Sequence, residues 1–175
     1  MHRATILAFT AFALLAALTQ ETLAQSTTNG VESRLTQSKV TRGSDGKERL
    51  ESAATTKPGE VIEYRASYAN KAKEPARSLE ATLPVPLGLE YVAGTVSPAG
   101  AMATIDNVKF EAIPLKRMVK QADGRMVERE VPTTEYRALR WKLGSLEAGK
   151  DTVVSARMRV APLEVSQVNA PASQK

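Results

Sequence analysis

Apolar and polar residues alternate along much of this chain, most clearly over residues 61–70. Apolar side chains occupy every second position and polar side chains lie between them: Ile62, Tyr64, Ala66 and Tyr68 against Glu63, Arg65 and Ser67. Because successive side chains of a β-strand point to opposite faces, this pattern predicts a strand with one row in the core and one in solvent. Ile62, Tyr64 and Tyr68 are therefore predicted core residues.

Similar short runs follow one another at near-regular spacing, with turn residues between them. The turn at 43–46 separates two arms that carry Val40 and Leu50, which predicts a hairpin. Further strands are predicted over residues 76–83, 89–96 and 108–113. Since no helical periodicity follows residue 24, the chain is predicted to be an all-β protein, an antiparallel β-sandwich of about eight or nine strands.

The last two apolar runs of the chain also suggest which strands pair. A pairing that places Trp141 opposite Val154 places Leu139 opposite Ala156 as well, so that apolar side chains meet on one face. A shift by one residue would set each of these side chains beside one that faces the other way. The sequence therefore predicts that the two runs form a hairpin, with Leu139, Trp141 and Val154 in the core.

A separate hairpin is predicted within residues 116–131. Asp123 and Gly124 lie between two alternating arms, and Asp-Gly is a strong signal for a tight hairpin turn. We interpret residues 116–131 as an insertion in the sandwich. It has two possible roles, since it either covers a sheet edge or projects as a binding arm.

The first 24 residues have the three-part layout of a secretory signal peptide. Arg3 gives a positive start, residues 4–18 are mainly apolar, and a more polar stretch ends in small residues before a cleavage site after Ala24. A membrane anchor is the alternative, but a spanning helix needs about 20 apolar residues and this run is shorter. The expected organisation is a signal peptide at 1–24, a flexible lead-in at 25–32, the sandwich at 33–160 with its hairpin at 116–131, and a disordered tail at 161–175.

The composition argues against most catalytic chemistry. The chain has no cysteine, and its single histidine, His2, lies in the predicted signal peptide. The mature chain would therefore lack the Ser-His-Asp and Cys-His arrangements and most zinc sites, although a Ser-Lys pair stays open. Its carboxylates are too dispersed for a calcium loop. We expect no enzyme activity, no cofactor and no metal, and we read Asn70 as a turn residue rather than as a partner in a Lys–Asn crosslink.

The charge and the missing cysteines indicate a compartment and one candidate surface. An exported domain without disulfides is typical of the bacterial periplasm or cell surface. The net charge is +5, and Arg140, Lys142 and Arg157 are predicted to project from the same outer face. That face is either a solvated one with counter-charges across the strands or a contact for anionic polysaccharide. Nucleic acid is not an expected partner.

Four sequence segments, taken in order, resemble a known family. They are Lys57-Pro58-Gly59-Glu60 with the strand that follows, Tyr68-Ala69-Asn70, Leu83-Pro84 through Gly88-Leu89-Glu90-Tyr91-Val92 with Gly94, and Trp141-Lys142-Leu143-Gly144-Ser145-Leu146 with Gly149. Together they resemble the Domain of Unknown Function 11 family, the conserved-repeat domain of bacterial surface and exported proteins. The resemblance implies an immunoglobulin-like β-sandwich that acts as a spacer or adhesive module without established enzymatic activity. The chain differs from many relatives in carrying a single copy and the 116–131 hairpin.

Two functions follow from these expectations. The first is a non-catalytic module of the cell envelope that makes structural or adhesive contacts with envelope or surface proteins, by pairing along unpaired strand edges. The alternative is a periplasmic binding module for carbohydrate or an anionic envelope polymer. No second long apolar run follows the signal peptide, so no stable membrane span is expected in the mature chain.

Overall fold

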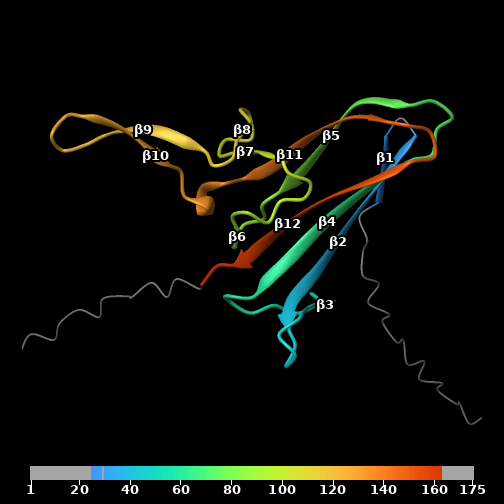
Figure 1. Cartoon of the computed structure of the whole chain (residues 1–175), viewed down its shortest axis with the longest axis horizontal. Helices are drawn as coiled ribbons and strands as arrows, with labels where there is room; N and C mark the ends of the chain where they lie inside the picture. The colour runs from blue at the N-terminus through green and yellow to red at the C-terminus, as the bar shows by residue number, and fades with distance from the viewer. Residues whose placement is uncertain (1–24, 29, 163–175) are drawn as a thin grey trace, which may run out of the picture.

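Antiparallel β-strands make up most of the structure, a computed structural model that describes residues 25–28 and 30–162 (Figure 1). The strands are β1 (Gln25–Thr28), β2 (Val31–Arg42), β3 (Glu48–Ser52), β4 (Val61–Asn70), β5 (Ala76–Pro84), β6 (Leu89–Tyr91), β7 (Met102–Thr104), β8 (Glu111–Ala112), β9 (Lys116–Lys120), β10 (Met126–Glu130), β11 (Ala138–Leu146) and β12 (Asp151–Val160). The strands form three sheets: one has the order β1-β2-β4-β12-β6, with β3 also paired to β2, the second has the order β5-β11-β7-β8, and β9 and β10 form the third. The predicted all-β fold with antiparallel sheets is confirmed.

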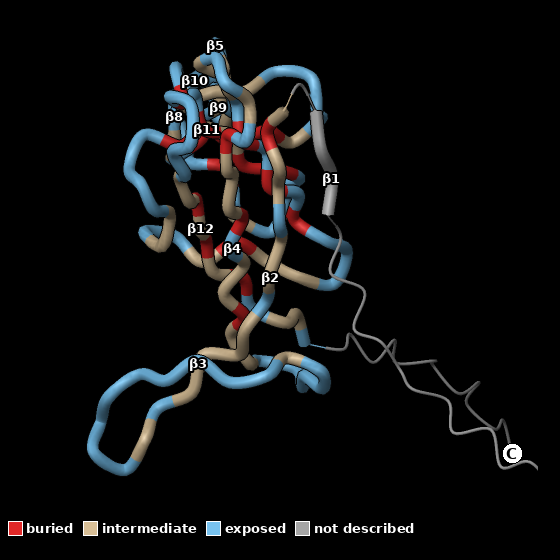
Figure 2. Tube along the Cα trace, turned by 90° about the vertical axis from the view of Figure 1, so that its right-hand side faces the viewer, coloured by how far each residue is buried: buried red, intermediate tan, exposed pale blue. Residues whose placement is uncertain are grey.

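The two larger sheets share one core. Most of its buried side chains come from β4 and β12 on one side and from β5, β7 and β11 on the other (Figure 2). Leu139 and Val154 are fully buried, Trp141 is 2% exposed and Ile62 is 4% exposed. Tyr64 and Tyr68 are half-buried and pack against this core. The Trp141 indole N–H donates a hydrogen bond to the Pro98 carbonyl at 2.8 Å, which satisfies the one polar group of the ring.

The predicted hairpin between the last two apolar runs is wrong. Trp141 on β11 lies opposite Ala81 of β5, and Val154 on β12 lies opposite Ala66 of β4, so the two runs belong to different sheets. Alternation shows which side chains face the core, but it does not show which sheet a strand joins. The loop between the runs crosses from one sheet to the other, and both apolar rows still point inward.

The strands also differ locally from the prediction. Within the flexible lead-in expected at 25–32, the structure forms β1, which pairs with the start of β2 from Gln25 opposite Arg34 to Thr28 opposite Val31. The predicted strand at 89–96 is shortened to Leu89–Tyr91, and the one at 108–113 to Glu111–Ala112. The hairpin around 43–46 is formed by β2 and β3. The signal peptide predicted at 1–24 and most of the tail predicted at 161–175 lie outside the described residues.

Asn70 fastens one end of the sandwich. It is fully buried, and its side-chain amide donates hydrogen bonds to the carbonyls of Glu74 and Leu146, both at 2.9 Å. Its side-chain oxygen accepts a hydrogen bond from the Ala72 N–H at 3.0 Å. Asn70 therefore acts as a turn residue, as predicted, and ties the β4–β5 turn to the end of β11.

Among the described residues, the secondary structure contains no α-helix, only a 3-10 turn, η1 (Thr133–Glu135). Correspondingly, no helix in this part of the chain has the length and apolar character needed to cross a bilayer.

Candidate functional site

The β9–β10 hairpin, here called the arm, extends away from the sandwich (Figure 1). It spans residues 116–130, and its register runs from Lys116 opposite Glu130 to Lys120 opposite Met126. Gly124 in the turn has φ +87°, a conformation that favours glycine. The hairpin predicted from Asp123-Gly124 is confirmed. In the structure the arm projects (Figure 1).

Apolar side chains are exposed along the arm. Met118 is 58% exposed, Met126 53% and Val119 43%. Methionine adapts its shape to different surfaces and is frequent where proteins bind one another. Met118 and Met126 share one face of the arm and Val119 lies on the other, and apolar side chains gathered on one face of a projecting element are a common mark of a contact site. The arm is therefore the candidate functional site of the described chain.

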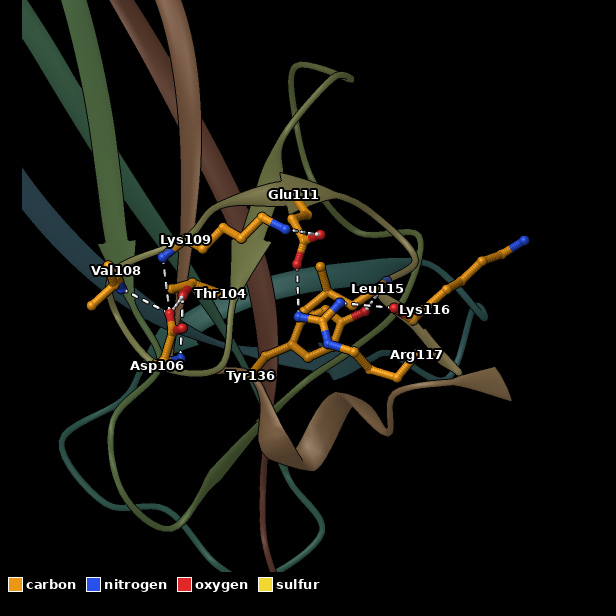
Figure 3. A network of polar contacts seen from close by, with 9 residues as sticks. All are labelled: Thr104, Asp106, Val108, Lys109, Glu111, Leu115, Lys116, Arg117 and Tyr136. Atoms are coloured by element: carbon orange, nitrogen blue, oxygen red, sulfur yellow. Dashed lines mark hydrogen bonds and ion pairs between the residues drawn. The ribbon is translucent and has the colours of Figure 1, made fainter. Parts of the chain in front are cut away.

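The base of the arm is fixed to the core (Figure 3). Leu115 and Val131 flank the arm and are 1% and 9% exposed, and the Val131 N–H donates a hydrogen bond to the Leu115 carbonyl at 2.8 Å. The Leu115 N–H donates to the hydroxyl of Tyr136 at 2.9 Å. The Tyr136 ring stacks on Tyr91 with centroids 5.7 Å apart. The arm thus leaves the sandwich from a base held by backbone hydrogen bonds and aromatic packing.

Ion pairs stiffen the same base. Glu111 accepts from Arg117 at 2.6 Å and pairs with Lys109 at 3.0 Å (Figure 3). Hydrogen bonds from Lys109 and Arg117 lower the pKa of Glu111, so this carboxylate stays charged at neutral pH. Further out, Lys116 pairs with Glu128 across the arm at 2.9 Å, and this contact raises the pKa of Lys116.

Asp106 organises the loop that leads into this network. Its carboxylate accepts from the N–H groups of Val108 and Lys109 at 2.8 and 2.9 Å and from the Thr104 hydroxyl at 2.8 Å. These bonds, led by the one from Val108, lower the pKa of Asp106 to about 2. The same turn explains why the predicted strand at 108–113 is short, since a carboxylate that binds its own backbone favours a turn.

The structure does not place Arg140, Lys142 and Arg157 on one common face, as was predicted for a contact with anionic polysaccharide. Arg140 lies on β11 and Arg157 on β12, so they belong to different sheets. The two arginines were predicted to share a face only because their strands were expected to pair. Lys142 is exposed on β11 opposite Glu80.

Both arginines bind carboxylates of the chain itself. Arg157 pairs with Glu48 at 2.7 Å and with Glu63 at 3.3 Å, and it lowers the pKa of Glu48. Arg140 lies 3.6 Å from Glu80 and stacks over the Phe110 ring at 3.7 Å. This is the arrangement of counter-charges across strands, the first of the two interpretations given for this face.

A groove is the second site-like feature, and sequence reasoning did not find it. It has a volume of about 510 Å³ and lies between β5 and the neighbouring ends of β2 and β4, where Tyr68 and Leu79 form part of its wall. Arg77, Glu74 and Glu80 supply charged groups at its rim. Ser78 has φ +55°, so the strand is bent where it borders the groove. Only the side-by-side placement of three strands creates this space, and no local sequence signal marks it.

Among the described residues, no group of three or more His, Cys, Asp or Glu side chains is arranged so that it could hold a metal ion. No family model, no curated protein and no solved structure matches this chain.

Proposed function

We propose that this chain is a non-catalytic contact module of a bacterial cell envelope and that its arm binds a protein partner. The observation that carries the proposal is the arm itself, a short hairpin with exposed Met118, Val119 and Met126 on a hydrogen-bonded, buried base. Residues 1–24 have the features of a signal peptide, which supports export. The mature chain has neither histidine nor cysteine, which supports a role in binding.

We also propose that the sandwich is immunoglobulin-like, as the resemblance to the Domain of Unknown Function 11 family implies. Such sandwiches often contain a tyrosine corner, in which a tyrosine hydroxyl bonds to the backbone a few residues upstream. Tyr136 bonds to Leu115, 21 positions upstream, but the 15 residues of the arm account for most of this distance. Without the arm the separation would be 6, a spacing that supports the proposed immunoglobulin-like sandwich.

The direct test places a photo-crosslinking amino acid on the arm in the bacterium that makes the protein. We expect a crosslinker in place of Met118 or Met126 to form adducts with a defined envelope protein. The matched control replaces Leu50 of β3, which is 50% exposed and lies outside the arm. Equal adduct yields at residue 50 and on the arm, or no adducts on the arm, would refute the proposal.

A second test removes the arm. Because Leu115 and Val131 are already joined by a backbone hydrogen bond, an Asn-Gly turn in place of residues 116–130 should close the gap. We expect the shortened protein to keep a melting temperature within about 4 °C of the full chain, since few buried contacts are lost. It should lose the crosslinked partner in co-purification. Retention of the partner would show that the contact lies elsewhere.

The groove supports a second candidate, binding of a carbohydrate. A half-buried tyrosine beside charged and hydroxyl groups is a suitable surface for a sugar ring, and burial raises the pKa of Tyr68. Titration with peptidoglycan and polysaccharide fragments, followed by NMR, distinguishes the two candidates. The groove hypothesis predicts shifts that Tyr68→Ala abolishes and that removal of the arm leaves unchanged.

A further inference from the structure

The backbone pairing inside the arm leaves one set of polar groups pointing outward. Gln121 and Arg125 form a hydrogen-bonded pair, and so do Val131 and Leu115 at the base. In an antiparallel ladder, hydrogen-bonded and non-bonded pairs alternate, so the opposed residues Val119 and Val127 bond to one another. The intervening residues of β9 then direct their N–H and C=O groups away from β10. They are Lys116, Met118 and Lys120.

Within residues 25–28 and 30–162, β9 pairs with β10 alone, so its outer edge is open. The Lys116 carbonyl accepts from the Arg117 guanidinium at 2.8 Å, and this bond closes the edge at the base. The N–H and C=O groups of Met118 and Lys120 stay available. Both residues are exposed, and neither is a proline or part of a bulge.

The edge of β5 is protected by comparison. Val85 and Arg137 form a hydrogen-bonded pair, so the outward residues of β5 are Glu80 and Thr82. Pro84 has no N–H to donate, and Ser78 with φ +55° bends the strand at its other end. Prolines and bends of this kind are the usual protection of an edge against strand addition. The edge of β9 contains neither a proline nor a bend, and its basic side chains repel basic strands but attract acidic ones.

The charge of β9 selects among incoming strands. Lys116, Arg117 and Lys120 are three of its five residues, and it contains no acidic residue. Lys116 and Arg117 already pair with Glu128 and Glu111, whereas Lys120 forms no ion pair within the described part of the chain and is the charge most available to an incoming carboxylate. Opposite charges directly across a strand pair stabilise it and like charges destabilise it. A basic edge therefore repels another β9 and attracts an acidic strand.

We infer that the arm binds an extended acidic segment of another protein, which adds to the outer edge of β9 as a third strand. This inference rests on the proposed function, and it names the class of partner. Backbone bonds to Met118 and Lys120 supply the ladder, and acidic side chains opposite the basic residues of β9 supply the selectivity. The incoming strand carries apolar residues opposite Met118 and Val119, whose exposed surfaces it covers.

A second copy of the chain is a poorer occupant. Its acidic β10 could meet β9 in the antiparallel sense, but both sandwiches would then lie at the same end of their arms. Neighbouring strands are about 4.8 Å apart, whereas the two sheets of one sandwich are already about 10 Å apart. The space beside β9 is therefore too narrow for a second sandwich, but it is wide enough for a single extended acidic segment.

The test uses a short peptide, Glu-Val-Ile-Glu-Glu with blocked ends, added to the ¹⁵N-labelled chain and followed by NMR. In antiparallel register it sets acidic residues opposite Lys116, Arg117 and Lys120. We expect saturable shifts with a Kd in the micromolar to millimolar range. The amide protons of Met118 and Lys120 should move most, whereas those of Arg117 and Val119 are already bonded inside the arm.

Two controls make the result decisive. The peptide Lys-Val-Ile-Lys-Lys should bind at least tenfold more weakly. Met118→Pro removes an outward N–H and should abolish binding, whereas Glu128→Pro removes the matching outward N–H of β10 and should preserve it. Shifts on β10 instead of β9, equal binding of both peptides, or no saturable shift would each overturn the inference. NMR shifts of β9 that depend on protein concentration in the absence of peptide would also overturn the inference, because they would show that a second copy of the chain binds there. Crosslinks at residue 118 that persist despite a negative titration would preserve the proposed function.

Discussion

The two stacked tyrosines at the base of the arm allow a matched test of how the arm is held. The Tyr136 hydroxyl accepts the Leu115 N–H at 2.9 Å, and both residues are 1% exposed. The Tyr91 hydroxyl is also buried, but no described residue gives it a hydrogen bond of good geometry. The N–H groups of Gly94 and Thr95 lie near enough to lower its pKa, yet burial outweighs them and raises it. The two rings therefore stack on one another, while their hydroxyls differ in hydrogen-bond partners.

Tyr136→Phe keeps the ring and its stacking and leaves the buried Leu115 N–H without an acceptor. Such an orphaned group costs about 1–3 kcal/mol of the free energy of unfolding. Tyr91→Phe removes a polar atom that has no good partner, so we expect a change within about 0.5 kcal/mol, or a gain. For a domain of this size, each kcal/mol corresponds to about 3–5 °C in melting temperature.

Urea unfolding followed by the fluorescence of Trp141, the only tryptophan, measures both changes. Hydrogen exchange adds a local reading, because the Leu115 amide should exchange faster in Tyr136→Phe and at an unchanged rate in Tyr91→Phe. Equal losses of stability in the two variants would refute the reasoning. So would a larger loss in Tyr91→Phe.

Three further predictions concern polar groups elsewhere. Asn70→Asp would set a buried carboxylate against the two carbonyls that the amide now serves, which costs about 3 kcal/mol or more at pH 7. Its pKa would be raised in the folded state, so the urea midpoint of this variant should fall as pH rises from about 4 to 7, with a flatter profile in the wild type. Asp106 has a lowered pKa of about 2, so the stability it contributes is present above about pH 4 and is lost as pH falls toward 2. In Asp106→Asn the urea midpoint should change less over that interval, and an unchanged slope would contradict this account. Arg157→Ala removes the ion pairs to Glu48 and Glu63 and should cost about 1 kcal/mol and speed amide exchange in β3, whereas Arg159→Ala, at an exposed position, serves as the neutral control.

The inward-facing rows could be predicted from sequence because alternation is a local property. Ile62, Leu139, Trp141 and Val154 are buried as their spacing indicates. Which sheet a strand joins is not local, since the loop before β12 can serve either as a hairpin turn or as a crossing between sheets. That ambiguity explains both the wrong pairing and the loss of the shared arginine face.

Other features escaped because a single side chain decides them. Asp106 captures the backbone of Val108 and Lys109, and this ends a run that otherwise alternates like a strand. The hydrogen bond from Leu115 to Tyr136 spans the whole arm, so neither residue has a nearby sequence signal of the contact. The arm was predicted from Asp123-Gly124, but its open edge follows only from the hydrogen-bonding phase of the ladder.

The closure of the chain between Leu115 and Val131 has a consequence for how such a protein diversifies. Substitution, lengthening or replacement of the segment between these two residues leaves the buried core of the sandwich in place, because residues 116–130 contribute no side chain to it. The surface that the arm presents can therefore change without a large change in the stability of the sandwich. The same junction is a natural place to graft foreign peptides for display.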